Sequence, residues 1–146
     1  MSPLWIKPRK GELISPIGGD QTYYKVIGEQ TGGHFAMLEQ TVPPVQGPRK
    51  NVHTREDESF YILEGDFGFE IGDWSFVAGP GSFVFGPRDI PHRFWNAGTT
   101  TGRFLLTISS PGLEPFFTEF SNVLAAFPSD QVRQAEIAAR YGLYFV

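Results

Sequence analysis

The sequence predicts an all-β domain, a sandwich or barrel built from short strands. Composition is the first observation: 17 glycines, 12 prolines and 14 phenylalanines in 146 residues indicate many chain reversals between short aromatic segments. The second is a series of β-prone runs, each bounded by Gly, Pro or Asp. These runs cover residues 4–7, 12–15, 22–28, 34–42, 50–54, 59–64, 66–71, 74–78, 82–85, 92–96 and 103–109.

Alternation with a period of two supports several of these strands. Phe67, Phe69 and Ile71 alternate with small or polar residues, as a strand with one buried face requires. Gly65 and Gly72 separate such runs, and glycine readily adopts the positive φ of a tight hairpin turn. We therefore expect hairpins at both glycines.

The pattern changes after Ser110, where apolar residues begin to recur at the three-and-four spacing of an amphipathic helix. This spacing predicts a helix over about 113–124. A second helix is expected over about 130–141, with Ser129 as its N-cap and Gly142 at its end. We expect both helices to plug one end of the barrel or cover a sheet edge rather than to form a partner site.

Length and charge limit the possible roles. The chain fits a single domain over 1–146, with a barrel core at about 22–110. A net charge of −4 with scattered basic residues argues against nucleic-acid binding. No apolar run approaches the ~20 residues of a membrane span, and the first thirty residues hold no run typical of a signal peptide, so a cytoplasmic location is expected.

Two segments contain the residues that could bind a metal or take part in catalysis. Asn51 and His53 lie two apart in an extended run and share one face. A polar turn follows, and a hairpin of this shape would bring Glu58 opposite His53. Farther along, Pro91 introduces a run in which His92 supplies a second imidazole. Cys is absent, so metal ligands here are limited to imidazole, carboxylate and amide groups.

These two segments resemble the two motifs of the cupin superfamily, and the small single-domain cupin 2 group most of all. The first motif is matched by Gly47, Asn51, His53, Glu58 and Gly65, and the second by Pro87, Pro91, His92 and Asn96. The likeness spans roughly residues 33–110. It implies a jelly-roll (double-stranded β-helix) barrel with one or two C-terminal helices, and it implies a homodimer.

The resemblance also implies a divalent metal, Fe, Mn, Ni or Zn, held by His53, Glu58 and His92. Two His and one carboxylate are the ligand set of facial-triad iron sites, which leave positions open for water, substrate or O₂. Asn51 stands where the family has a further imidazole. It is either a weak fourth ligand, a residue that orients a bound water, or a sign that metal binding has been lost. Each histidine alone is also compatible with an ordinary hydrogen-bonded role.

The function that the resemblance implies is a metal-dependent dioxygenase of the quercetinase type, acting on a small aromatic or flat organic molecule, with Glu58 as the catalytic residue. One alternative is a cyclase or isomerase in small-molecule biosynthesis, in which Glu58 or His92 acts as a general acid or base. Another is a non-catalytic module that binds a small molecule. Candidate pocket residues, equally suited to the core, are Met37, Phe60, Phe69, Phe76, Phe85 and Phe94.

Other polar and aromatic residues are expected to lie outside the site. His34 matches no ligand position and is interpreted as the start of a strand. The charged residues 55–57 are expected to form a solvated turn. Arg93 and Trp95 should point outward from their strand.

Overall fold

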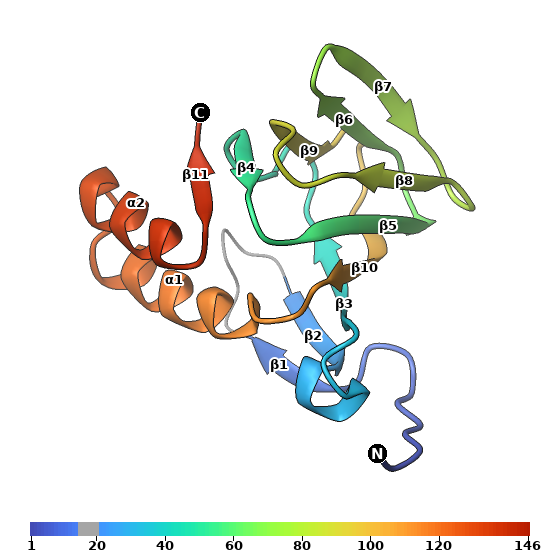
Figure 1. The fold of residues 1–146 in the computed structure, drawn as a ribbon. Helices are drawn as coiled ribbons and strands as arrows, with labels where there is room; N and C mark the ends of the chain where they lie inside the picture. The colour runs from blue at the N-terminus through green and yellow to red at the C-terminus, as the bar shows by residue number, and fades with distance from the viewer. Residues whose placement is uncertain (15–20) are drawn as a thin grey trace.

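Two antiparallel sheets face each other in the computed structural model, which describes residues 1–14 and 21–146 (Figure 1). One sheet has the strand order β1-β2-β3-β10-β5-β8 and the other the order β11-β4-β9-β6-β7. The first sheet consists of β1 (Glu12–Ile14), β2 (Gln21–Val26), β3 (Ala36–Val42), β10 (Gly102–Ser109), β5 (Asp57–Glu64) and β8 (Phe83–Gly86). The second consists of β11 (Leu143–Phe145), β4 (Asn51–His53), β9 (His92–Asn96), β6 (Phe67–Ile71) and β7 (Trp74–Ala78).

This architecture is the all-β jelly roll that the sequence and its family resemblance predicted. One of the two expected hairpins forms: Gly72, with φ 56°, joins β6 and β7, which pair with each other. The hairpin expected at Gly65 is wrong, because this glycine, with φ 81°, joins β5 to β6 and these strands belong to different sheets. Burial alternates strictly along β10, so one of its faces packs inside and the other lies outside.

Phenylalanine rings fill the space between the sheets. Phe60 of β5 makes ring contacts with Phe69 of β6, Phe94 of β9 and Phe104 of β10, with centroid separations of 5.2 to 5.7 Å. Three of these four rings are at most 1% exposed. The aromatic content of the sequence therefore forms a core that holds the two sheets together.

The C-terminal part adds two helices and a strand. Helices α1 (Glu114–Ala126) and α2 (Gln131–Arg140) lie side by side at one side of the barrel (Figure 1). The N-cap of α2 is Asp130, whose side chain accepts a hydrogen bond from the Arg133 amide, so the expected cap at Ser129 is wrong. Strand β11 was not expected. It pairs with β4 and extends the sheet that carries two of the candidate ligands.

The N-terminal part differs from expectation at several points. Residues 4–7 form no strand, because side chains rather than a backbone ladder hold this arm: Lys25 donates to the carbonyls of Lys7 and Lys10, and the Arg9 amide donates to the carboxylate of Glu39. Ser15 lies outside the described residues. The exposed His34 precedes β3 by two residues, after a short 3₁₀ helix η1 (Gly28–Thr31).

No helix among the described residues is long and apolar enough to cross a membrane.

Candidate metal centre

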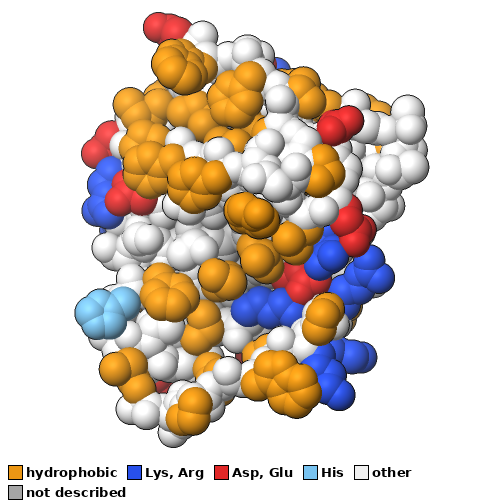
Figure 2. Space-filling view, turned by 90° about the vertical axis from the view of Figure 1, so that its right-hand side faces the viewer, with side chains coloured by type: hydrophobic (Ala, Val, Ile, Leu, Met, Phe, Trp, Pro, Cys, Tyr) orange, Lys and Arg blue, Asp and Glu red, His pale blue; other side chains and the backbone are white. Residues whose placement is uncertain are grey.

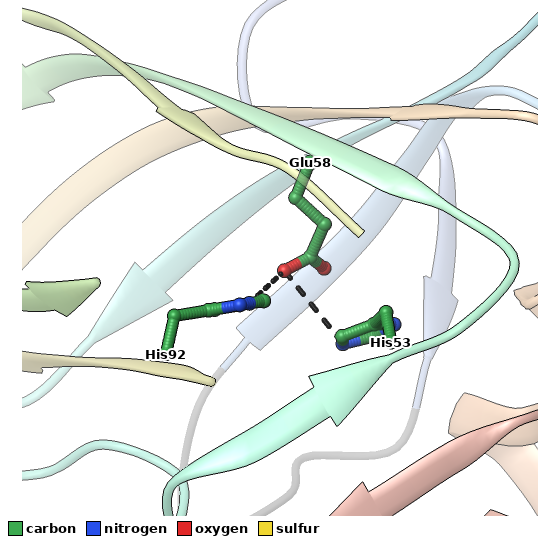
Figure 3. Close-up of side chains that lie close together, drawn as sticks. All are labelled: His53, Glu58 and His92. Carbon is green, nitrogen blue, oxygen red and sulfur yellow. Dashed lines mark hydrogen bonds and ion pairs between the residues drawn. The ribbon is translucent and has the colours of Figure 1, made fainter. Parts of the chain in front are cut away.

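Three buried side chains converge from three different strands (Figure 3). His53 ends β4, Glu58 lies near the start of β5, and His92 begins β9. The Glu58 Oε2 atom lies 2.8 Å from His92 Nε2 and 3.7 Å from His53 Nε2. One ligand atom from each residue lies within 4.8 Å of the others. The residues are 4 to 6% exposed, so the cluster lies inside the barrel.

Strand alternation and register place these groups together. Asn51 and His53 are both buried on one face of β4, as predicted, and Asn51 pairs with His92 across β4 and β9. Glu58, Phe60 and Ile62 form the buried row of β5, on the opposing sheet. The expected hairpin between these two runs is wrong, because the short connection over residues 54–56 carries the chain from one sheet to the other. The carboxylate nevertheless faces the imidazoles.

Each imidazole is also contacted on its far side. His92 Nδ1 lies 3.1 Å from the carbonyl oxygen of Ile90, and His53 Nδ1 lies 3.4 Å from Oε2 of Glu56. A proton on each Nδ1 would face these oxygens. Both Nε2 lone pairs would then point at the space beside Glu58, the arrangement in which histidines ligate metals.

Asn51 adds an unpaired acceptor. Its Nδ2 donates to the carbonyl oxygen of Arg49 at 2.9 Å, which fixes the amide. Its Oδ1 is buried and has no hydrogen-bond partner among residues 1–14 and 21–146. Because a buried unpaired acceptor costs about 1–3 kcal/mol, this oxygen is well suited to a metal, a water or a ligand group at the cavity wall.

Electrostatics couple the three residues. Burial, the largest single influence, disfavours the charged form of His53, but the negative charges of Glu58 and Glu56 outweigh it and raise the pKa of His53. Burial likewise opposes ionisation of Glu58, yet the two histidines outweigh it and lower the pKa of that carboxyl. The cluster therefore favours an ionised carboxylate, which is the form that binds a cation.

The donor set fits a divalent metal. Bonds of about 2.0–2.2 Å from nitrogen and oxygen to a shared ion put ligand atoms ~3 Å apart, close to the two separations at Glu58. Asn51, whose buried amide oxygen is unpaired, lines the same cavity, and its expected role as a fourth ligand stays a prediction. The described residues thus include a buried His-Glu-His group that could bind a metal, with its identity open among Fe, Mn, Ni and Zn.

The cluster opens into a cavity of about 470 Å³ between the barrel and the C-terminal segment. Aromatic side chains form much of its wall, and its polar lining combines amide side chains with the His-Glu-His cluster. Its lining consists of Ile14, Thr22, Gln40, Val45, Gln46, Gly47, Pro48, Asn51, His53, Glu58, His92, Arg93, Phe94, Leu106, Phe116, Phe117, Phe120, Leu143 and Phe145.

The predicted pocket residues are mostly elsewhere. Phe94 lines the cavity, whereas Phe60 and Phe69 are sealed in the aromatic core. Phe76 and Phe85 border a second, open depression between β7 and β8. The sixth, Met37, lies between the buried positions 36 and 38 of β3 and outside the cavity lining. The aromatic content correctly indicated packing, but did not identify which rings face the ligand space.

Two groups of functional residues escaped the sequence reasoning. Glu56 is 3% exposed and contacts His53, so the expectation of a fully solvated turn at 55–57 is wrong at this position. Its spacing of three residues from His53 was the available signal. The other group is the aromatic set of α1 and β11, whose helical stripe had been recognised only as packing. Arg93, expected to point outward, is exposed and also borders the cavity.

Comparison with known proteins agrees with this picture. Residues 38–108 match the family described as the cupin domain. A predicted oxalate decarboxylase from Thermotoga maritima has a similar structure, with 21% identity, a TM-score of 0.65, and coverage of 73% of this chain and 99% of that one. KdgF from a Halomonas species has 12% identity and a TM-score of 0.68, over 78% and 99% of the two chains.

A further similar structure is a sugar phosphate isomerase of the cupin superfamily from Silicibacter pomeroyi, with 18% identity, a TM-score of 0.61, and coverage of 73% and 75%. No curated protein sequence matches the chain significantly. At these identities the likenesses show the fold, and the differing names of the three proteins assign no single reaction to this chain. Together with the domain match they support the cupin superfamily.

Proposed function

Because residues 38–108 match the cupin domain and the chain has the cupin fold, we propose that this protein is a metal-dependent dioxygenase, similar to quercetinases, for a small aromatic substrate. The observation that carries the proposal is the buried His53-Glu58-His92 cluster at the wall of an aromatic cavity. Two imidazoles and one carboxylate leave other coordination positions open. Substrate held in the cavity would lie next to those positions.

The site residues would have different roles in metal binding, proton transfer and substrate orientation. His53, His92 and Glu58 would hold the ion, which supplies Lewis acidity and a template for O₂ and substrate when bound. Glu58 is also placed to take a proton at Oε2 and share it with His92 Nε2, 2.8 Å away. The amide oxygen of Asn51 would accept a hydrogen bond from a substrate hydroxyl or a water, and so orient it.

The cavity wall favours a flat and largely apolar substrate. Phe116, Phe117 and Phe120 of α1 line the cavity, together with Phe94 and Phe145. About 470 Å³ is in the range of small-molecule sites. A planar aromatic molecule with one or two hydroxyl groups would use both the rings and the amide oxygens.

The same wall argues against a sugar phosphate. Arg93 is the one cationic residue among the described lining residues, and its guanidinium pairs with Glu70 at 2.6 Å and lies over Trp95 at 5.2 Å. A phosphate needs a free cation or a cluster of amide donors. The resemblance in fold to a sugar phosphate isomerase therefore does not extend to the substrate we propose.

A second candidate follows from the hydrogen bond between Glu58 and His92. A carboxylate and an imidazole in direct contact can exchange a proton without any metal, which suits a cyclase or isomerase that uses the barrel as a shaped cavity. Activity that survives complete chelation would favour this reading. A binding module without catalysis is the remaining alternative, since fold alone does not determine activity.

The test combines metal loading of the protein with a measurement of substrate turnover. Protein reconstituted separately with Fe(II), Mn(II), Ni(II) and Zn(II) is assayed for O₂ consumption with flavonols, catechols and other hydroxylated aromatics. We expect consumption with at least one redox-active metal, and its loss in Glu58→Gln. Tight metal binding without O₂ consumption across the panel would contradict the dioxygenase. Failure to bind any of these ions would contradict the metal site itself.

The homodimer expected from the family resemblance is proposed here with a specific surface. The edges of both sheets, β7 and β8, border an apolar depression that includes Trp74, Phe83 and Phe85. Figure 2 shows hydrophobic side chains gathered over the upper part of this side of the molecule. Residues 74–87 carry no charge, so a second copy with the same uncharged surface is a better partner than a charged molecule.

The exposed aromatic area is large enough to form a substantial part of a dimer interface. Trp74, Phe83 and Phe85 are 77%, 64% and 51% exposed. At roughly 150–250 Å² per aromatic side chain, their free surface sums to about 400 Å². This is half of the ~800 Å² that each partner contributes to a standard interface, before any neighbouring residue is counted.

Light scattering after gel filtration measures this association directly. The wild type should elute as a dimer and the double variant Trp74→Glu, Phe83→Glu as a monomer with an unchanged circular dichroism spectrum. Val132→Glu replaces an equally exposed apolar residue on α2 and should remain dimeric. A monomeric wild type, or a dimer that persists in the double variant, would contradict this surface.

A further inference from the structure

A buried carboxylate next to the site has no part in the cluster itself. Glu56 is 3% exposed, although its neighbour Arg55 is exposed and Asp57 is partly so. Burying an ionised carboxylate costs several kcal/mol unless a partner offsets the loss of hydration. The position of Glu56 therefore calls for a specific interaction.

That interaction is not with a basic residue. Among the described residues, the ion pairs of Lys and Arg do not involve Glu56; Arg88, close in sequence, binds Asp57 instead through its amide and its guanidinium. The polar atom in contact with Glu56 Oε2 is His53 Nδ1, at 3.4 Å. Neither of these two buried atoms has a hydrogen-bond partner in the described part of the chain, so the contact between them is at ion-pair distance and is each atom's nearest polar interaction there.

The contact decides which nitrogen of His53 is free. A neutral imidazole carries one proton, and a carboxylate beside Nδ1 favours the tautomer with the proton on Nδ1. Nε2 then keeps its lone pair toward Glu58, 3.7 Å away. Histidine ligands in metal sites are commonly oriented in this way by a carboxylate or carbonyl that accepts from the second nitrogen.

The two histidines differ in this respect. His92 faces the carbonyl oxygen of Ile90 at 3.1 Å, which is a neutral acceptor. His53 faces a negatively charged one. A carboxylate increases the electron donation of an imidazole more than a carbonyl does, so His53 should be the stronger of the two imidazole ligands.

We propose that Glu56 is a positioning residue that holds His53 in the tautomer and ring orientation needed for metal binding, without ligating the metal itself. The inference rests on the proposed metal site. It explains why an acidic residue three positions after His53 is buried, and it assigns a role to the turn between β4 and β5.

Two variants separate charge from shape. Glu56→Gln keeps an oxygen that can accept from His53 Nδ1 but removes the negative charge, and Glu56→Ala removes the acceptor. Glu39→Gln is the matched control, because Glu39 is equally buried, at 2% exposure, but belongs to a charged cluster with Lys25 and Arg103 away from the site. Co(II) is the probe, since its visible spectrum reports ligand identity and geometry.

The first measurement is the dissociation constant for Co(II) together with its visible spectrum. We expect Glu56→Ala to weaken binding by about 10- to 100-fold and to alter the Co(II) bands, with Glu56→Gln intermediate. Glu39→Gln should leave both unchanged, whatever it does to stability. Equal weakening in Glu56→Ala and Glu39→Gln would mean a general structural effect and would overturn the proposal.

The second measurement needs no metal. Nitrogen-15 NMR of the imidazoles, at a pH where both are neutral, should show the Nδ1-protonated tautomer at His53 in the wild type and a mixture in Glu56→Ala. An unchanged tautomer would overturn the proposal. If the wild type binds no Co(II), the proposed function fails, while the tautomer still decides whether Glu56 positions His53.

Discussion

Replacing His53 by alanine should abolish most of the stability that the protein gains from a bound metal. The chain has three histidines, which provides a matched control. His53 is 4% exposed and faces Glu58, whereas His34 is exposed and lies before β3. His34→Ala removes the same side chain outside the site, so the two variants differ in position alone.

The magnitude follows from linkage. A ligand present at 100 times its dissociation constant stabilises the folded state by about 2.7 kcal/mol, which for a chain of this size raises Tm by roughly 10 °C. Loss of one of three protein ligands should weaken binding by at least about 100-fold, the upper range for lost outer-shell partners. The same free metal concentration then equals the weakened dissociation constant. The stabilisation by metal falls to about 0.4 kcal/mol, and the increase in Tm to ~2 °C.

Differential scanning fluorimetry with Co(II) buffered at one free concentration measures these shifts. The wild type and His34→Ala should show the large increase in Tm over metal-free protein, and His53→Ala the small one. The increase for each protein is referred to its own metal-free state, so any intrinsic effect of the substitution cancels. An undiminished increase in His53→Ala would refute the assignment of His53 as a ligand.

Two further predictions concern the fold. Lys25 and Arg103 outweigh the effect of burial and lower the pKa of Glu39, so its contribution to stability is present above the ordinary pKa of 4.5 and is lost as pH falls through the lower folded value. Glu39→Gln should thus cost about 1.5–3 kcal/mol in urea unfolding at pH 7 and progressively less below pH 4.5; a cost independent of pH would contradict this ion pairing. Phe60→Ala should cost about 3–5 kcal/mol and the exposed Phe83→Ala under ~1 kcal/mol in the same assay, and similar costs would contradict the position of the core.

The sequence was most informative where a residue pattern maps directly onto backbone geometry. Alternation predicted the strands, because successive side chains of a strand face opposite sides. The spacing of Asn51, His53 and Glu58 predicted that their side chains share one interior, and the structure brings His53 and Glu58 together with His92. Such predictions depend on local geometry and on two linked motifs, both of which are visible in a linear sequence.

The sequence was least informative where packing between residues distant in the chain determines the structure. Glu56 looks like a solvated charge in the sequence, and its burial depends on how β4 and β5 are joined. The helical stripe of α1 predicted a buried face but not that Phe117 and Phe120 would face a cavity. Strand β11 is three residues long, too short for a periodic signal, and forms because β4 offers it an edge.

The cluster and much of the cavity wall come from different parts of the chain, and only one of these parts matches the cupin domain. All three clustered ligands lie within residues 38–108, the part that matches the cupin domain. Much of the aromatic wall comes from α1 and β11, outside that part. The pairing of β11 with β4 connects the two, because Leu143 lies opposite His53 and Phe145 opposite Asn51. If the proposed function holds, the shared barrel provides the residues for the metal, and the C-terminal segment that the family match does not include forms much of the wall that substrate would contact. On that proposal, the substrate of a similarly folded protein is a poor guide to the substrate of this one.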